Sequence, residues 1–522
     1  MKHSAQGFKA FVLFTAGLTG ALVMAIEVLG ARAVAPFFGV SLFVWTALIA
    51  VTLLALALGY LVGGMLADRK GSPAMLYGLI GGAGVWVLII PLIKITVFQA
   101  MLPLGLRWGA LLSALILFGP PLFLLGCVSP FVVRLATQEW DRLGRTVGLL
   151  YAISTAGSFF GTLITGYYVV AAWGVSHAFQ ASGVLLLGLT AIYFAVFRGR
   201  WAAVLLPFLA LGTGIMFPHQ TQAVLADGTV ATLINSQDGF YGRVQVVEYK
   251  GSEGHTRELV IDGLVQGGID VANGQSIYEY GYLLEHLAVA ANPQGQRCLV
   301  IGLGPGVVPR RFAARGIETE VVDIDPAVVT AARQYFGLPE GLRVHLADAR
   351  YFLGTATDQY DYIVLDVFNG DTTPGHLLTR EALELVRARL APGGVLALNL
   401  MGRLGGERRM TASVMRTLET VFPWVQAYPL FVPGVDGAGN IAVMAGLGKP
   451  LLEVPALDET EVHPFARATL RQALAQHFVW TGSNEGIVLT DDYNPIDVLD
   501  LPMKEAVRRR ILDSTPHELL LS

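Results

Sequence analysis

Seven apolar segments fill almost the whole of the first 217 residues, and they limit the fold more than any other feature of the chain. Each is at or near the roughly 20 residues that a helix needs to cross a bilayer. Because lipid offers no hydrogen-bond partners, a spanning segment must satisfy its own backbone groups, which favours helices. The segments are 8–35, 40–66, 74–98, 109–133, 146–172, 176–197 and 201–217. The sequence therefore predicts a transmembrane domain of about seven helices over residues 1–217.

The first segment must be distinguished from a signal peptide, and the last is short for a membrane span. Residues 8–35 are too long and too sparsely flanked by charge for a cleaved signal peptide, and further spans follow them. Residues 201–217 form the shortest expected span and contain Pro207. At about 1.5 Å per residue they reach about 26 Å, slightly less than a hydrocarbon core of about 30 Å. We expect this segment to cross with some local thinning of the bilayer, and the alternative is a re-entrant segment that returns to the same side.

Lysine and arginine residues in the short loops predict the orientation, because such residues are retained on the cytoplasmic side. A cytoplasmic N-terminus in the inner (plasma) membrane leaves only Arg107, with Lys94 near a helix end, on the outer side. The inner segments then carry Lys2, Lys9, Arg69, Lys70, Arg134, Arg142, Arg145, Arg198 and Arg200. An odd number of spans places residues 218–522 outside. This conflicts with a cofactor made inside the cell, so the side of the C-terminal part stays open.

The composition excludes some classes of partner. The chain is 53% hydrophobic and 15% charged, against about 25% charged in soluble domains, and nearly all of the apolar excess precedes residue 218. A net charge of -4, without a basic patch interleaved with aromatic residues, argues against a nucleic-acid partner. The two cysteines, Cys127 and Cys298, lie in apolar segments and are expected to be core thiols. No metal site is expected.

A glycine loop and three aspartates organise residues 295–400. The loop Gly302-Leu-Gly304-Pro-Gly306 follows the apolar run 298–301, and Asp323, Asp348 and Asp366 follow three further apolar runs. These runs, at 320–322, 343–347 and 362–365, read as buried parallel strands, and a turn within 390–399 leads into a fifth. Ligands of an open α/β sheet bind beyond the carboxyl ends of its strands. The sequence thus predicts a Rossmann-like domain that binds a nucleoside-like cofactor.

The spacing of these residues suggests how such a cofactor is held. The glycines allow the backbone to turn tightly and approach the ligand, and Asp323 follows about 20 residues later, where an acid accepts hydrogen bonds from ribose hydroxyls. Asp348, with Ala349 beside it, is placed to receive the exocyclic amine of adenine. The pattern resembles the S-adenosylmethionine type of Rossmann fold and not the nicotinamide type.

The segment before the glycine loop indicates a family. Residues 243–249 and 258–266 alternate as strands around a turn at 251–254, and a helix is expected from Ser276 to Ala291. A small antiparallel β-domain that ends in Leu-Val-Ile-Asp-Gly-Leu-Val-Gln266, followed by a tyrosine-rich helix and a Rossmann core, resembles the spermidine synthase (polyamine aminopropyltransferase) family over roughly 235–430. We therefore expect a β-domain over 223–275, a catalytic domain over 276–448 and a C-terminal helical extension over 449–522.

The resemblance implies a function for individual residues. Asp323 becomes the ribose acid, Asp348 the adenine contact and Asp366 the catalytic acid, with Gln266 and Tyr280 on the substrate side. The co-substrate is then decarboxylated S-adenosylmethionine, and the acceptor is an amine such as putrescine. Besides this amine, the expected partners are the lipid bilayer and further copies of the chain in a homo-oligomer. A free amine has a pKa near 10.4 and an aspartate near 3.9, so Asp366 must be desolvated or act chiefly by orienting the amine.

The chain departs from the family at three positions that contact cationic groups. Pro305 replaces the acid of the glycine loop, Asn369 replaces a second acid after the catalytic one, and the helix carries Tyr280-Gly281-Tyr282 in place of Tyr, Gln or His, and Glu. Asp371 can replace the lost acid if the loop is one residue longer. Further acids in the segment 490–495 either fold back over the site or form an Asx turn.

Two other functions remain open at this stage. One is an S-adenosylmethionine-dependent methyltransferase, for which Pro305 presents no difficulty. The other is a membrane transport or scaffold protein whose soluble domain binds a nucleoside or polyamine without turnover. The missing cation contacts favour this last reading, whereas the position of Asp366 disfavours it.

Overall fold

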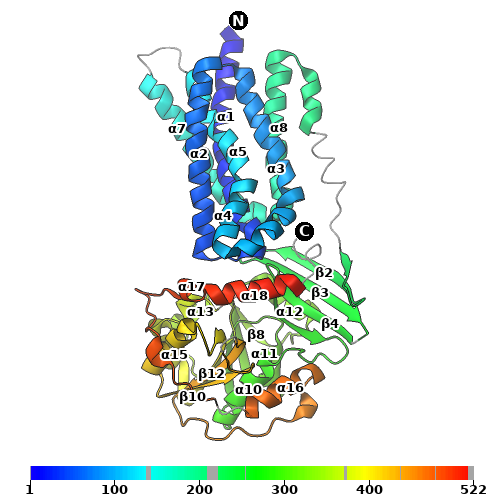
Figure 1. The fold of residues 1–522 in the computed structure, drawn as a ribbon, viewed down its shortest axis with the longest axis vertical. Coiled ribbons are helices and arrows are strands. Elements are labelled where there is room, and N and C mark those ends of the chain that lie inside the picture. Colours follow the sequence, from blue (N-terminus) through cyan, green and yellow to red (C-terminus); the bar gives the residue numbers. More distant parts are fainter. Residues whose placement is uncertain are drawn as a thin grey trace. The chain divides into compact units, whose positions relative to one another are not determined.

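The computed structural model describes residues 2–136, 143–207, 221–252, 254–368, 373–434, 437–475 and 478–514. The chain divides into two compact units (Figure 1). The first comprises residues 1–220, 237–242 and 521–522, and the second comprises 221–236 and 243–520.

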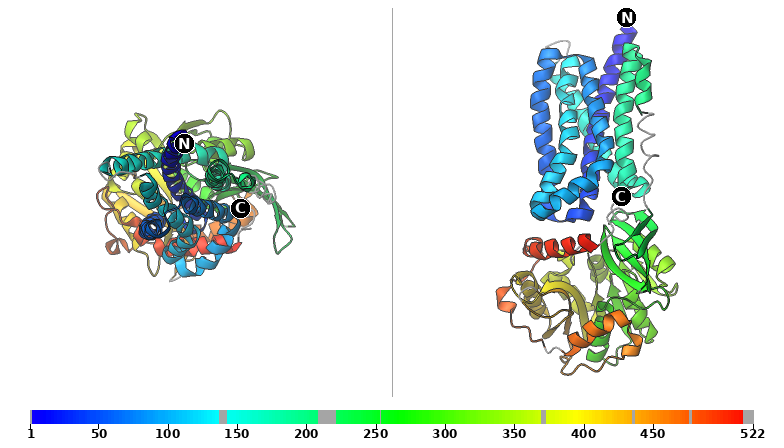
Figure 2. Two further views of the ribbon diagram at one scale, coloured as in Figure 1. Left: turned by 90° about the horizontal axis from the view of Figure 1, so that it is seen from above. Right: turned by 45° about the vertical axis from the view of Figure 1, so that its right-hand side comes forward.

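Long apolar helices make up the first unit and run side by side, as the right-hand view of Figure 2 shows. Six helical stretches among the described residues are long and apolar enough to cross a membrane: Gln6–Phe38, Leu42–Arg69, Pro73–Leu117, Gly119–Ala136, Gly144–Val169 and Ala172–Phe197. The individual helices are α1 (Lys2–Phe38), α2 (Leu42–Lys70), α3 (Pro73–Met101), α4 (Gly105–Leu117), α5 (Gly119–Gly126), α6 (Val128–Ala136), α7 (Leu143–Ile164) and α8 (Val170–Ile192).

Two of the expected spans differ from the observed helices. The segment 109–133 was expected to be one span, but it is divided among α4, α5 and α6. A proline lacks a backbone N–H and its ring clashes with the preceding turn, so Pro120 and Pro121 begin a new helix instead of continuing the old one. Of the expected seventh span, only 201–207 is described, and its first four residues form a short 3₁₀ helix. Residues 208–217 lie outside the described residues.

Glycines let the helices of the first unit approach closely. A Cβ atom on Gly157 of α7 would lie 2.0 Å from the carbonyl oxygen of Gly17 in α1. A Cβ atom on Gly63 of α2 would lie 2.5 Å from Cα of Cys127, just before α6. Small residues at these positions allow backbone contact, which is how apolar helices associate when there is no water to exclude.

The second unit begins with a five-stranded sheet in the order β1-β2-β3-β4-β5. The strands are β1 (Gln222–Val224), β2 (Val230–Asp238), β3 (Arg243–Gly251), β4 (Gly254–Ile261) and β5 (Leu264–Asp270). The single strand expected over 258–266 is therefore wrong, because Asp262 and Gly263 form a two-residue turn between β4 and β5. Both have positive φ, 47° and 78°. Asp-Gly is a typical sequence for such a hairpin turn, since it tolerates this conformation.

A seven-stranded sheet follows in the order β11-β12-β10-β9-β6-β7-β8, and the predicted Rossmann-like domain is confirmed. Its strands are β6 (Arg297–Ile301), β7 (Glu318–Asp323), β8 (Arg343–Leu346), β9 (Tyr360–Leu365), β10 (Leu390–Arg403), β11 (Trp424–Pro429) and β12 (Ala438–Gly446). Strands β10, β9, β6, β7 and β8 each pair in parallel with the next strand in this order, whereas β12 is antiparallel to both β10 and β11.

Helices cover both faces of this sheet, so its strands are apolar on both sides. Val300 and Val364 belong to one buried cluster, and their neighbours Leu299 and Ile363 belong to the other, because successive side chains of a strand point to opposite faces. The helices are α10 (Tyr280–Ala291), α11 (Val307–Ala314), α12 (Pro326–Tyr335), α13 (Ala349–Thr355), α14 (Arg380–Arg389), α15 (Arg409–Val421), α16 (Pro464–Ala475), α17 (Ile496–Leu499) and α18 (Leu501–Ser514). Helix α10 begins four residues later than expected, since Ser276 instead forms a turn with Tyr278.

The order of the strands defines where a ligand can bind. From β6 the chain proceeds outward to β7 and β8, and then returns to place β9 on the other side of β6. The direction of strand order therefore reverses between β6 and β9. Such a reversal opens a crevice at the carboxyl ends of the two strands.

Candidate functional site

The glycine loop and Asp366 meet at this reversal. Gly302 follows β6 directly, has a φ of +92°, and would place a Cβ atom 2.1 Å from the carbonyl oxygen of Asp366. The backbone N–H of Asp366 donates to the carbonyl of Ile301 at 2.9 Å. Only glycine allows this contact. The predicted cofactor loop and the predicted catalytic acid therefore lie side by side, backbone against backbone.

Asp323 ends β7 and holds the glycine loop in place. One carboxylate oxygen accepts the N–H of Leu303 and the other accepts the N–H of Asp325, both at 2.8 Å. Burial raises the pKa of Asp323 to about 6, and these backbone hydrogen bonds oppose the rise. Each carboxylate oxygen has a second lone pair, so Asp323 can also accept hydrogen bonds from a ligand. The other two loop glycines, Gly304 and Gly306, also have positive φ, and Gly306 begins α11.

Asp348 and Ala349 lie where β8 passes into α13. Oδ1 of Asp348 accepts the N–H of Tyr351 at 2.9 Å and so caps the helix, of which Ala349 is the first residue. Oδ2 lies 3.6 Å from Nε2 of His376. The side chain of Asp348 is 43% exposed, which leaves it accessible to a ligand. The structure thus gives Asp348 a structural role in addition to the expected adenine contact.

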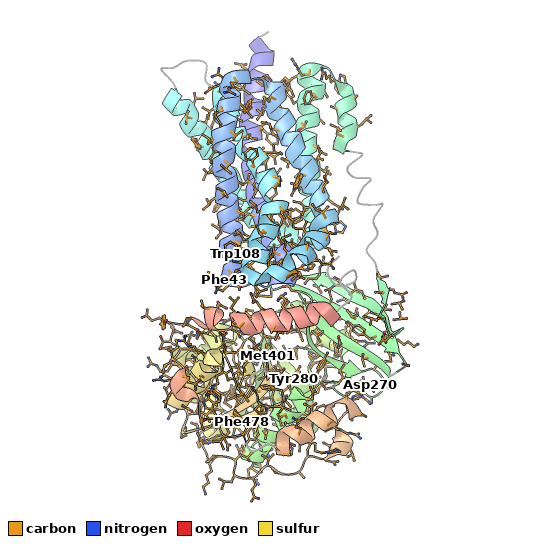
Figure 3. The ribbon with its side chains drawn as sticks, in the orientation of Figure 1. Phe43, Trp108, Asp270, Tyr280, Met401 and Phe478 are labelled. Atoms are coloured by element: carbon orange, nitrogen blue, oxygen red, sulfur yellow. The ribbon has the colours of Figure 1, made fainter. Side chains whose placement is uncertain are left out.

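Asp366, like Asp323, is an acid with a raised pKa. Burial raises its pKa to about 6, while a hydrogen bond of 2.8 Å from the side-chain amide of Asn399 lowers it. Tyr280 lies at the start of α10 (Figure 3), and burial together with the charge of Asp366 raises its pKa. Asp366 is partly exposed. A carboxyl that titrates near neutrality and still reaches solvent is suited to exchange protons with a ligand.

Gln266, Tyr280 and Pro305 pack together beside this acid. The hydroxyl of Tyr280 donates to the carbonyl of Gln266 at 3.0 Å, whereas the side-chain amide of Gln266 donates to Leu264 of its own strand at 3.2 Å. A Cβ atom on Gly267 would lie 2.8 Å from the Tyr280 hydroxyl and 2.9 Å from Cγ of Pro305. An apolar ring therefore occupies the loop position where the resembling family carries an acid.

The remaining predicted substrate residues, Asn369 and Asp371, lie outside the described residues. The C-terminal segment 490–495 has features of both expected alternatives: Asp491 contacts Arg350 of α13, and Oδ1 of Asn494 accepts the N–H of Ile496 at 3.3 Å in a turn before α17. Asp491 forms a bidentate ion pair with Arg350, with one contact at 2.7 Å, and its N–H donates to Glu381 at 3.0 Å. Hydrogen bonding to Arg350 lowers the pKa of Asp491. This acid therefore fastens the segment to the start of α13, next to Asp348, and its charge is already paired.

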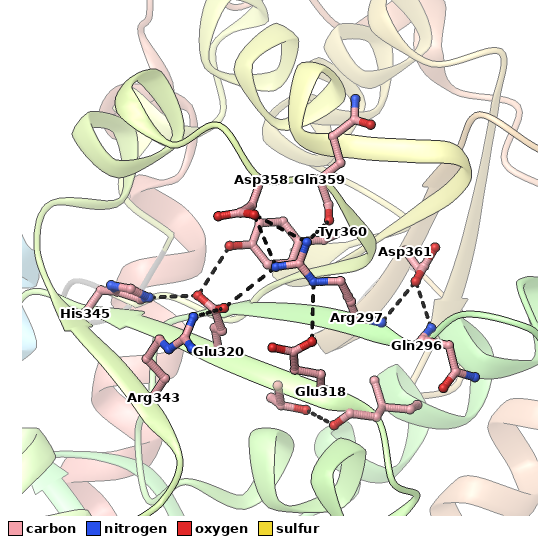
Figure 4. Close-up of polar contacts among 12 residues, drawn as sticks. Gln296, Arg297, Glu318, Glu320, Arg343, His345, Asp358, Gln359, Tyr360 and Asp361 are labelled. Carbon is pink, nitrogen blue, oxygen red and sulfur yellow. Dashed lines mark hydrogen bonds and ion pairs between the residues drawn. The ribbon is translucent and has the colours of Figure 1, made fainter.

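A second polar cluster, which the sequence did not suggest, lies away from the crevice (Figure 4). Glu320 is buried and contacts Arg343 at 2.7 Å and His345 at 2.8 Å. Arg297 lies 3.4 Å from Asp358 and 3.9 Å from Glu320. Since Arg297 and Arg343 are the first residues of their strands, this cluster joins the opposite end of the sheet and does not contribute to the site. Within the described residues, no group of three or more His, Cys, Asp or Glu side chains is arranged to hold a metal ion.

Sequence reasoning missed one residue of the site, Asn399. An asparagine within the apolar strand Leu396-Ala-Leu-Asn-Leu400 was the available signal, because a buried amide requires a hydrogen-bond partner. The strand pattern alone gave no indication that this partner would be Asp366.

The C-terminal part of the chain is similar to several known proteins. Residues 278–447 match the family model described as Spermine/spermidine synthase domain. An N-terminal histidine N-methyltransferase of Emericella nidulans is 31% identical over 305 residues, which cover 54% of this chain and 50% of that protein. A polyamine aminopropyltransferase of Vibrio vulnificus is 42% identical over 115 residues, which cover 21% of this chain and 38% of that one. The chain thus spans half or less of the length of these two relatives. A probable spermidine synthase from Corynebacterium glutamicum has a similar structure, with 24% identity and a TM-score of 0.38, over 47% of this chain and 88% of that one.

Proposed function

We propose that the chain is a membrane-anchored polyamine aminopropyltransferase, since residues 278–447 match the family model described as Spermine/spermidine synthase domain. It transfers the aminopropyl group of decarboxylated S-adenosylmethionine to an amine such as putrescine. The observation that carries this proposal is the position of Asp366, an acid with a pKa of about 6 that lies against the glycine loop and near Tyr280.

The reaction is a displacement at carbon. The lone pair of the amine nitrogen forms a bond to the carbon next to the sulfonium, and the carbon–sulfur bond breaks with its electron pair going to sulfur. The products are methylthioadenosine and an amine extended by one aminopropyl group, and the nitrogen releases one proton. This chemistry calls for an acid that can accept a proton and for a site that orients two cations.

The residues at the strand ends divide these tasks. The backbone of Gly302, Gly304 and Gly306 lets the cofactor approach the loop, Asp323 receives its ribose, and Asp348 with Ala349 lies at its adenine. Asp366 faces the amine, with Tyr280 and Gln266 bordering the same space. Free amines have a pKa near 10.4. The pKa of Asp366, about 6, is therefore about 2 units closer to that of the amine than the pKa of an ordinary aspartate is. Asp366 therefore orients the amine, stabilises its developing charge and accepts its proton.

A methyltransferase is the second candidate, and Pro305 favours it. The proline ring packs on Gly267 beside Tyr280, where an acid would be needed to hold the amine of the aminopropyl group. A relative from Emericella nidulans is named an N-terminal histidine N-methyltransferase, and one from Homo sapiens is named an eEF1A lysine and N-terminal methyltransferase. Both candidate reactions move an alkyl group from a sulfonium to an amine nitrogen, so the same acid serves either.

Product analysis distinguishes the two reactions. The full chain, purified in detergent, is incubated with each donor and a panel of amines, and the products are identified by mass spectrometry. Methylthioadenosine with an aminopropylated amine supports the first proposal, and S-adenosylhomocysteine with a methylated amine supports the second. Binding of methylthioadenosine without either product in the wild-type chain overturns both and favours a non-catalytic binding protein.

A further inference from the structure

Two asparagines lie behind Asp366 on the neighbouring strands. Asn399 is in the middle of β10 and is 1% exposed, between the apolar residues Leu398 and Leu400. Asn440 is near the start of β12, opposite Met401 in the strand register, while Asn399 is opposite Ala442. Residues two apart on a strand share a face, so Asn399 and Asn440 are diagonal neighbours on one side of the sheet.

A chain of hydrogen bonds joins these residues to Asp366. The amide nitrogen of Asn440 donates to the side-chain oxygen of Asn399 at 2.9 Å, and the amide nitrogen of Asn399 donates to Oδ1 of Asp366 at 2.8 Å. An ionised carboxylate can only accept hydrogen bonds, so Asn399 must turn its nitrogen toward it and its oxygen toward Asn440. Both amides therefore point their hydrogens in the direction of Asp366. This direction favours the ionised form of the acid.

The same contacts fix the geometry of the carboxyl group. The backbone of Asp366 is held by the carbonyl of Ile301 and by its close approach to Gly302, and Oδ1 is held by Asn399. Among the residues that the structure describes, none donates a hydrogen bond to Oδ2. Within the described residues, one oxygen is thus bonded to protein, and the other is open to a ligand.

We propose that Asn399 and Asn440 are positioning residues for the transfer, which hold Oδ1 of Asp366 so that Oδ2 accepts the proton of the attacking amine. The inference rests on the proposed function of Asp366 and applies equally to aminopropyl and methyl transfer. Burial raises the pKa of Asp366, whereas the hydrogen bond from Asn399 lowers it. Burial favours the protonated form of Asp366, and a protonated acid cannot receive the proton.

The pH dependence of turnover separates this role from a structural one. A hydrogen bond to a charged group shifts a pKa by about one unit. Asn399→Leu should therefore raise the pKa of the acidic limb by about one unit, and Asn440→Leu should raise it by less. Asn440→Asp keeps the shape of the side chain but replaces a hydrogen-bond donor with an acceptor that has the same charge as Asp366. It should therefore raise the pKa of the acidic limb more than Asn440→Leu does.

Gln426→Leu serves as the matched control. Gln426 is also a side-chain amide beside β12, but it bonds to the backbone N–H and carbonyl of Leu451, at 3.1 and 2.9 Å. Its loss removes two hydrogen bonds from the same sheet without touching Asp366. The control should leave the acidic limb unmoved. If Asn399→Leu and Asn440→Asp lower turnover by a constant factor at every pH, the asparagines have only a structural role and the proposal is overturned.

A second measurement decides the question without turnover. Infrared difference spectra of the full chain, recorded as the pH is changed, report the protonated carboxylic C=O band, and Asp366→Asn assigns the part that belongs to Asp366. The pH of half-protonation should rise in Asn399→Leu and Asn440→Asp, and an unchanged value contradicts the proposal. If the wild-type chain transfers no group from either donor, the proposed function fails, and the infrared shift still establishes whether the asparagines control Asp366. Should the buried Asn399→Leu variant not fold, the partly exposed Asn440 position keeps both tests available.

Discussion

The carbonyl oxygen of Asp366 lies 2.1 Å from the position that a Cβ atom would take on Gly302. The proposed cofactor loop and the proposed catalytic acid are therefore joined through their backbones, at the point where the strand order reverses. A substitution at Gly302 is therefore expected to displace Asp366, and a shift of the Asp366 backbone is expected to move the glycine loop.

Gly302→Ala should impair both cofactor binding and turnover, because the new Cβ atom would displace the Asp366 backbone. The positive φ of +92° adds a strain of about 1–3 kcal/mol. Calorimetric titration with methylthioadenosine and initial rates would measure the two effects. Gly316→Ala is the matched control, since Gly316 follows α11 outside the glycine loop, has a φ of +79°, and would bring its Cβ atom within 4 Å of no neighbour, so only the strain remains. Equal losses in the two variants would show that the contact with Asp366 is unimportant.

Asp366→Asn should lower turnover by at least about 10²-fold while methylthioadenosine still binds. The substitution keeps the shape of the side chain and its hydrogen bond from Asn399, but it removes the charge and the ability to accept a proton. Single-turnover rates and calorimetry on the same preparation would separate the two properties. A variant as active as the wild type would refute the assignment of Asp366 as the proton acceptor.

The raised pKa of Asp366 predicts how both rate and stability depend on pH. Turnover should rise as the pH increases through about 6, with the slope of a single ionisation, since only the ionised acid can accept a proton. For stability the direction is opposite, because the native state binds the proton more tightly than the unfolded chain, so ionisation weakens the fold between pH 4 and 6. Asp366→Asn should therefore be more stable than the wild type at pH 7 and equally stable below pH 4. Urea unfolding followed by tryptophan fluorescence would test this, and a constant difference across the range would contradict it.

Asp323→Ala should weaken methylthioadenosine binding by about 10-fold or more. It removes an acceptor for the ribose and also the hydrogen bonds to Leu303 and Asp325 that shape the glycine loop. Calorimetric titration gives the change directly. Asp361→Ala is a suitable control, because Asp361 likewise accepts two backbone N–H groups, of Gln296 and Arg297, but at the other end of the sheet. Unchanged affinity in Asp323→Ala would mean that the adenosine is bound elsewhere.

The side of the membrane on which the second unit lies remains a proposal, and we expect it to be outside. Loop charges favour a cytoplasmic N-terminus, and the six described stretches together with the expected span 201–217 make an odd number, which would export the C-terminus. An alkaline phosphatase fused after Ser522 should be active, since this reporter folds only after export. Fluorescence from a fusion that matures only in the cytoplasm would reverse the topology and would bring the site to the supply of its cofactor.

Local patterns predicted the position of each strand-end acid. Asp323, Asp348 and Asp366 each follow a short apolar run, and a run of this kind between turns forms a strand in most contexts. The same kind of reasoning failed at 258–266, because alternation of apolar residues continues across the two-residue turn at Asp262. It also failed at 109–133, where hydropathy is insensitive to the break that Pro120 and Pro121 impose.

The sequence by itself determined that Asp366 would end a buried strand and face a ligand crevice, since both properties follow from residues close to it in the chain. Only the tertiary structure decided what holds its carboxyl group. Asn399 is 33 residues from Asp366 in the sequence, and Asn440 is a further 41 residues from Asn399. Their strands lie side by side in the sheet, in the order β12-β10-β9. A hydrogen bond between side chains requires contact within about 3 Å. That proximity is created by strand pairing across the sheet, and neither the spacing nor the type of these residues in the sequence specifies it.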